Sequence, residues 1–114
     1  MAQSRSLSVG AYTASTTQTQ AGGTVLNSDI CVLTQSNASD AFTIPANLPT
    51  GTMIFLKHGA TNAGLLFPPV GGAINGGTVD ASKPVDVDII SVLICTLGGS
   101  ASTYVWNKLA ALSA

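Results

Sequence analysis

The sequence contains very little charge. Its 114 residues include four Lys or Arg and five Asp, so charged residues make up 8% of the chain, against roughly a quarter of an ordinary soluble domain. It has no Glu and a single His. Ser, Thr, Asn, Gln, Gly and Ala must therefore cover the surface, and such a surface favours contact with other protein over free solution. The composition predicts a component of an assembly.

Other absences exclude whole classes of function. The net charge is −1 and the Lys and Arg residues do not cluster, whereas nucleic-acid binding needs several clustered cations. The nearly uncharged run from Ile89 to Leu97 is too short for a membrane span, which takes about 20 residues. The first ten residues lack the apolar core of a secretory signal. We therefore expect neither nucleic acid nor a membrane as a partner, and synthesis in a cytoplasm.

Few residues could perform chemistry. His58 ends a predicted strand without an acidic neighbour, which is typical of a turn or surface histidine rather than a catalytic one. Asp86 and Asp88 share one strand face; calcium would need six to eight oxygens, so a solvated edge strand is favoured. Cys31 and Cys95 lie in apolar segments, and we expect buried thiols rather than a disulfide. The sequence predicts no enzyme, no metal and no cofactor.

The N-terminal part differs in composition from the remainder. Residues 1–23 are rich in Ser, Thr and Gln, carry one charge and cannot bury enough apolar area to form a core. We interpret them as an extended N-terminal arm, which either frays or becomes ordered on a partner. The candidate contact residues of this arm are Arg5, Leu7, Val9 and Tyr12.

Residues 24–114 consist of short β-type runs separated by turn signals. Asn27-Ser28-Asp29 separates two such runs, Leu48-Pro49-Thr50-Gly51 reads as a turn, and Asn75-Gly76 is the favoured pair for a tight turn. Regularly spaced short strands with Gly/Pro turns predict an all-β fold. We expect a β-sandwich or barrel-like single domain.

The predicted strands carry apolar residues on both faces. Met53 and Phe55 point to one side of a strand, and Ile54 and Leu56 point to the other. An antiparallel sheet with one wet face should alternate cleanly between apolar and polar residues, so a second layer or a neighbouring subunit must cover these strands. The candidate subunit-interface residues are Met53, Phe55, Tyr104 and Trp106, with core packing as the favoured alternative for the two last-named aromatics.

Three stretches carry a resemblance to a known family. They are Leu48-Pro49-Thr50-Gly51 with the strand that follows it, Asn62-Ala63 with Phe67 to Gly76, and Tyr104-Val105-Trp106. Together they resemble small virion proteins of tailed bacteriophages, in which an aliphatic or aromatic residue precedes a Pro-x-Gly-Gly-x-Ile-Asn-Gly turn. The resemblance covers residues 24–108 and leaves the N-terminal arm unmatched.

The resemblance implies a β-sandwich-like module that is usually trimeric and has no enzymatic activity. It implies a capsid decoration (cement) protein that binds the major capsid protein lattice on the exterior of the virion and stabilises the head. The alternative is a receptor- or glycan-binding module of a tail fibre, head fibre or spike. A fibre protein usually carries a long repetitive shaft, and none is visible in this sequence, so we expect decoration by a homotrimer.

Overall fold

Ten strands make up the regular structure of the described residues. A computed structural model describes residues 7–35, 37, 39–58, 64–85, 90–97 and 105–110. The strands are β1 (Val9–Thr13), β2 (Thr24–Val25), β3 (Ile30–Thr34), β4 (Ala41–Thr43), β5 (Met53–His58), β6 (Leu65–Phe67), β7 (Ala73–Ile74), β8 (Lys83–Pro84), β9 (Ile90–Leu97) and β10 (Val105–Ala110). The expected all-β character is confirmed. These residues include no helix long and apolar enough to cross a membrane.

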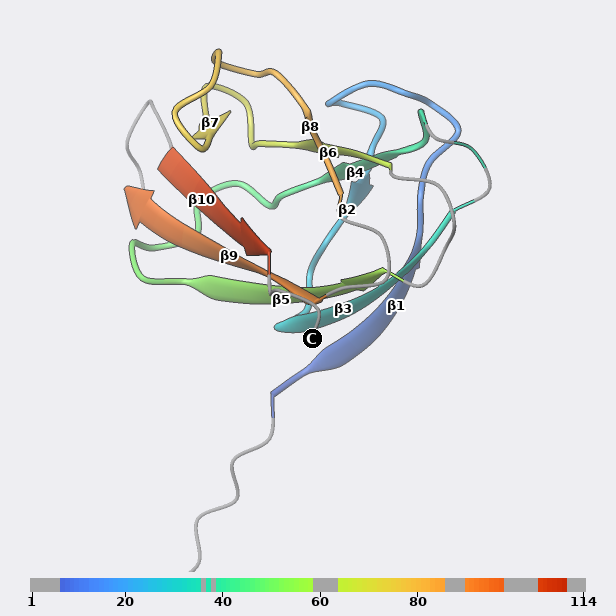
Figure 1. Cartoon of the computed structure of the whole chain (residues 1–114), viewed down its shortest axis with the longest axis horizontal. Helices are drawn as coiled ribbons and strands as arrows, with labels where there is room; N and C mark the ends of the chain where they lie inside the picture. The colour runs from blue at the N-terminus through green and yellow to red at the C-terminus, as the bar shows by residue number, and fades with distance from the viewer. Residues whose placement is uncertain are drawn as a thin grey trace, which may run out of the picture.

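The strands form two open sheets. The six-stranded sheet has the order β1-β3-β5-β9-β10-β7, and the four-stranded sheet has the order β2-β4-β6-β8. Figure 1 shows them as two layers, with β1, β3 and β5 in the lower layer and β2, β4 and β6 in the upper one. Each sheet contains both parallel and antiparallel pairs.

The first six strands wind back and forth between the two sheets. Among these six, the odd-numbered strands belong to the six-stranded sheet and the even-numbered strands to the four-stranded sheet, and neighbours within each set of three pair in parallel. Val9 lies beside Ile30, which lies beside Phe55. Parallel neighbours need a crossover connection, and here the crossover is a strand of the other sheet. β9 reverses this direction, because it runs antiparallel to both β5 and β10.

The expected β-sandwich or barrel-like arrangement with an extended arm is therefore wrong. The sheets do not close, and the turn signals do not mark hairpins. The turn Asn27–Asp29 carries the chain from one sheet to the other, so that β2 and β3 do not pair with each other. Local turn chemistry could not distinguish the two outcomes, because a hairpin and a crossover can begin with the same residues.

The arm prediction fails for residues 7–23 because their polar groups bond to the remainder of the fold. β1 pairs with β3 along its whole length, and Ala14 lies in the core. The Gln20 side-chain amide donates to Pro68 O at 2.8 Å, and the Thr43 hydroxyl donates to Gln20 O at 2.8 Å. The segment thus gains its order from hydrogen bonds as well as from apolar area. Residues 1–6, with Arg5, lie outside the described residues.

The hydrophobic core lies between the two sheets. Along β5 the buried residues Ile54, Leu56 and His58 alternate with Met53 and Lys57, which are exposed. The same alternation places Cys31 and Leu33 of β3 inward. The largest buried side chain is that of Trp106, and the core cluster further includes Leu26, Phe42, Ile44, Leu66, Ile74, Val85, Leu93 and Cys95. Both cysteines are buried and free, which confirms the expectation for them.

Candidate protein-binding surface

An apolar row crosses the outer side of the six-stranded sheet. Val9 of β1 is the in-register partner of Ile30, Ile30 of Phe55, and Phe55 of Val92 on β9. In-register residues share a sheet face, so the four side chains lie next to one another across four strands. Val9 is 64% exposed, and the other three are half-buried. We call this set the apolar row.

The apolar row is the centre of a wider apolar surface, which we call the outer face. It consists of the odd-numbered residues of β1 and β5 and the even-numbered residues of β3 and β9. All of them are apolar except three threonines and Lys57. Four strands about 4.8 Å apart and about five residues long cover on the order of 300 Å². Apolar patches of a few hundred Å² are uncommon on monomers and mark interaction sites.

The pairing pattern makes this surface unusual. Parallel strands are normally covered on both sides and are therefore apolar on both sides. β1, β3 and β5 have this composition, but in the described part of the chain the four-stranded sheet covers only their inner side. Val32, Met53 and Ile90 are each at least 40% exposed. The outer face has the composition of a buried surface without a cover from the described residues.

The structure separates the predicted interface residues. Met53 and Phe55 lie on the outer face. Trp106 is 0% exposed and belongs to the core, so its assignment to the subunit interface is wrong and the core alternative holds. Alternation along β10 could not show which side faces the four-stranded sheet. Tyr104 lies outside the described residues.

The candidate contact residues of the predicted arm differ in their exposure to solvent. Leu7 and Val9 are exposed, whereas Tyr12 points inward and packs against the core. The Tyr12 hydroxyl lies 2.6 Å from Ser28 Oγ. Tyr12 is therefore tied to its own chain. Sequence reasoning missed Ile30 and Val92, because their place in the apolar row depends on which strands pair.

The residues weighed for chemistry do not converge. His58 is fully buried, and its Nε2–H donates to Gln35 Oε1 at 2.6 Å, so the expected turn or surface position is wrong. It shares the inward side of β5 with Ile54 and Leu56. Asp86 and Asp88 lie outside the described residues. Among the residues that the structure does describe, no three His, Cys, Asp or Glu side chains gather as a metal site would require.

Burial also makes the thiols poor nucleophiles. Desolvation raises the pKa of Cys31, and the nearby Asp29 carboxylate adds to this effect against a hydrogen bond to Ser28. Desolvation likewise raises the pKa of Cys95. The reactive form of cysteine is the thiolate, so burial lowers the reactivity of both thiols.

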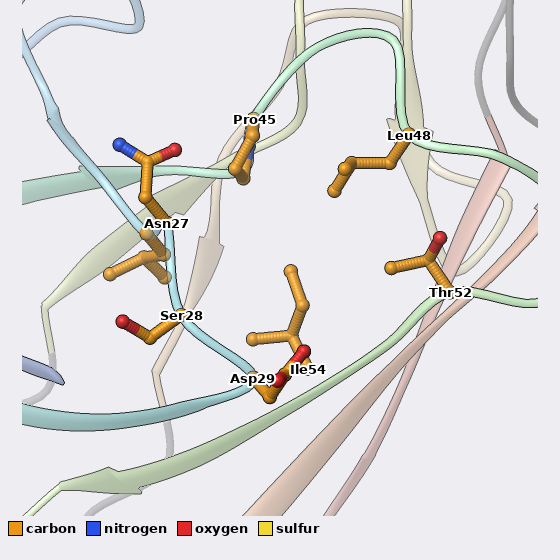
Figure 2. Close-up of a pocket in the computed structure, with 8 residues that line it drawn as sticks. Asn27, Ser28, Asp29, Pro45, Leu48, Thr52 and Ile54 are labelled. Atoms are coloured by element: carbon orange, nitrogen blue, oxygen red, sulfur yellow. The ribbon is translucent and has the colours of Figure 1, made fainter. Parts of the chain in front are cut away.

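A small pocket opens between the turn Asn27–Asp29 and the loop that precedes β5 (Figure 2). Leu26 and Ile54 form its buried apolar floor, and Asn27, Asp29 and Thr52 contribute polar groups. Asp29 Oδ2 already accepts hydrogen bonds from the backbone N–H and the hydroxyl of Ser8. The pocket volume is about 120 Å³, well below the roughly 300 Å³ at which ligand sites begin. The pocket is therefore small compared with ordinary ligand sites.

Comparisons with protein-family models, with curated proteins and with solved structures found no match to this chain.

Proposed function

We propose that this protein is a capsid decoration (cement) protein of a tailed bacteriophage. It binds the major capsid protein lattice on the exterior of the virion and stabilises the head, and it acts as a homotrimer without enzymatic activity. The observation that carries the proposal is the outer face, an apolar surface on a chain with 8% charged residues. The resemblance of residues 24–108 to small phage virion proteins supports the same function.

The outer face supports association of copies through protein contact alone. Homo-oligomeric interfaces are more apolar than the remaining surface and are depleted of charged residues at their centre. The apolar row has no charged residue, and Lys57, the charged residue of the outer face, lies two residues from Phe55 along β5. In the proposed trimer the outer faces meet about a common three-fold axis. Closed symmetry covers the same patch on every copy and leaves no open end for filament growth.

A trimer also suits the geometry of an icosahedral shell. Three capsid subunits meet at the three-fold and quasi-three-fold points, so a trimer seated there contacts several subunits at once. Modest single contacts then combine into tight attachment, because each later contact is intramolecular. Stabilisation of the head follows from linking neighbouring subunits and needs no reacting group.

The test combines assembly state with shell stability. Light scattering of the purified protein should give three times the 11.4 kDa chain mass, and added protein should raise the temperature at which undecorated shells disrupt. The variant Phe55→Asp places a charge in the apolar row and should give a monomer that leaves shell stability unchanged. Val70→Asp adds the same charge at an exposed loop residue and should behave as the unsubstituted chain.

Copy number separates decoration from the alternative. Occupancy that follows the number of capsid lattice positions indicates decoration, whereas a few copies at one vertex indicate a fibre or spike module. A monodisperse monomer that leaves shell stability unaltered would refute the proposal. Binding of the protein to host glycans without binding to shells would favour the receptor-binding alternative.

A further inference from the structure

β1 forms an open edge of the six-stranded sheet. Among the described residues no strand lies on its far side. Ser8 O accepts from Ile30 N, and Ala14 N donates to Thr34 O, so the even-numbered residues direct their backbone groups toward β3. Successive residues of a strand point these groups to opposite edges. The N–H and C=O groups of Val9, Ala11 and Thr13 therefore point away from the sheet.

The edge of β1 differs from the other three sheet edges. β2 and β7 are two residues long, and β8 consists of Lys83 and Pro84. Short strands, lysine and proline are the features by which natural sheets prevent edge-to-edge pairing. β1 has five residues, contains no proline, and lies in a stretch from 7 to 28 without a charged residue. Of the four edge strands among the described residues, β1 is therefore the long one, and it lacks these protective features.

We infer that β1 pairs antiparallel with β1 of a second copy of this chain, about a two-fold axis at Ala11. The comparison of the four edge strands applies equally to a second copy, whose long unprotected edge is also β1. We therefore expect β1 of the second copy to be the partner strand. In this register Ala11 lies opposite Ala11 of the second copy, and Val9 lies opposite Thr13. Each such pair can exchange both of its N–H···O bonds.

The side chains are compatible with this pairing. The backbone groups that point away from the sheet belong to Val9, Ala11 and Thr13. The side chains of these three residues lie on the outer face and are small or β-branched and uncharged. Such cross-strand pairs stabilise a sheet, whereas like charges opposite each other would destabilise it. The Thr24 hydroxyl already donates to Thr13 O at 2.6 Å, and a carbonyl oxygen can accept a second bond.

Pairing at the β1 edge uses a surface different from the one that forms the proposed trimer. The edge offers backbone groups, and the outer face offers side chains. On a shell, adjacent three-fold sites are related by local two-fold axes, so an isologous contact at β1 would link neighbouring trimers. This role on the shell rests on the proposed function, but the β1 pairing itself does not.

The experiment traps the pairing as a disulfide in the purified protein, without shells. Residues directly opposite each other have Cα atoms about 5.5 Å apart, within the range that a disulfide bridges. Under mild oxidation Ala11→Cys should form a covalent dimer about tenfold faster than Val70→Cys, which measures random collision. The native thiols are buried and should contribute no background.

Two single variants test the register. Val9→Cys alone and Thr13→Cys alone should cross-link no faster than Val70→Cys, because each residue lies about 14 Å from its own copy in the partner strand. An equimolar mixture of Val9→Cys and Thr13→Cys should cross-link as fast as Ala11→Cys. This combination is the pattern expected of an antiparallel strand pair centred on Ala11.

Three results would overturn the inference. The first is an Ala11→Cys rate that does not exceed the Val70→Cys rate, and the second is a Thr13→Cys rate, measured alone, that matches the Ala11→Cys rate. In the third, Ala11→Lys weakens attachment to shells although Ala11→Cys forms no dimer, which assigns the edge to an extended segment of shell protein instead. Failure of the decoration proposal looks different, since the protein would then leave shell stability unchanged whether or not the Ala11→Cys dimer forms.

Discussion

Ile30 of β3 and Phe55 of β5 lie opposite each other on the outer face of the six-stranded sheet. Both are apolar, and Val9 and Val92 extend the row on either side. A parallel pair exposed to water would carry polar residues at such positions. The parallel strands that supply the core on one side thus present a second apolar surface on the other side. The same chain path therefore produces both the core and the surface that we propose for assembly.

We predict that thermal stability rises with protein concentration. If copies cover the outer face, association stabilises the folded state by mass action. Differential scanning calorimetry over a wide concentration range should show an increasing Tm for the unsubstituted chain and for Val70→Asp. Phe55→Asp should have a Tm that does not depend on concentration. A constant Tm for all three proteins would contradict a subunit interface on this face.

A second prediction concerns Gly10. A Cβ atom there would lie 2.5 Å from Ser28 Oγ and 2.7 Å from Cε2 of Tyr12, so these side chains must shift, which disturbs the 2.6 Å hydrogen bond between them. We expect Gly10→Ala to lower the free energy of unfolding by about 1–3 kcal/mol through overpacking.

Tyr12→Phe is the matched control for Gly10→Ala. It removes the same hydrogen bond without a steric clash and should cost about 1 kcal/mol. Urea titrations of the two variants give the comparison. A smaller loss for Gly10→Ala than for Tyr12→Phe would show that the Tyr12 ring does not pack closely over Gly10.

The sequence predicts the local features of this fold and misses the long-range ones. The inward and outward residues of β5 follow from a period of two within one strand. The Asn75-Gly76 turn is also confirmed, with both residues at positive φ and Gly77 N donating to Ile74 O. Both features depend on adjacent residues.

The apolar row depends on pairing between distant segments. Ile30 meets Phe55 only because the chain crosses to the other sheet and returns, and no local pattern encodes that path. Composition mispredicts residues 7–23 for a related reason, since it measures the apolar area of a segment and not hydrogen bonds such as that from Gln20 to Pro68. His58 is polar by type, but it is buried by its place on the inward side of β5.

We also predict that both thiols of the native protein resist labelling. Cys31 and Cys95 are buried, and burial raises the pKa of each. A thiol reagent at pH 8 should therefore react at a rate limited by unfolding, and both groups should react at once in denaturant. Val70→Cys adds a thiol at an exposed loop residue and should label immediately. Fast labelling of the unsubstituted native chain would contradict the burial of these residues.

The last prediction concerns the loop held by Asp80. Its Oδ1 accepts from the Gln20 side-chain amide at 3.0 Å and from Gly71 N at 2.7 Å. These two bonds, with Gln20 as the larger cause, lower the pKa of Asp80 below its ordinary value of 3.8. A carboxyl whose pKa is lower in the folded state stabilises the fold above its unfolded pKa, and this contribution is lost as the pH falls through the folded pKa.

Asp80→Asn tests this contribution with little change in shape. Asparagine keeps the acceptor oxygen and tolerates the positive φ of 65° found at this position. The unsubstituted chain should have the higher Tm from neutral pH down to about pH 4, because a carboxylate accepts hydrogen bonds more strongly than an amide oxygen. The difference in Tm should shrink below that pH and vanish once Asp80 is protonated. A Tm difference that stays constant from pH 7 to about pH 2 would show that charge at Asp80 does not hold the loop.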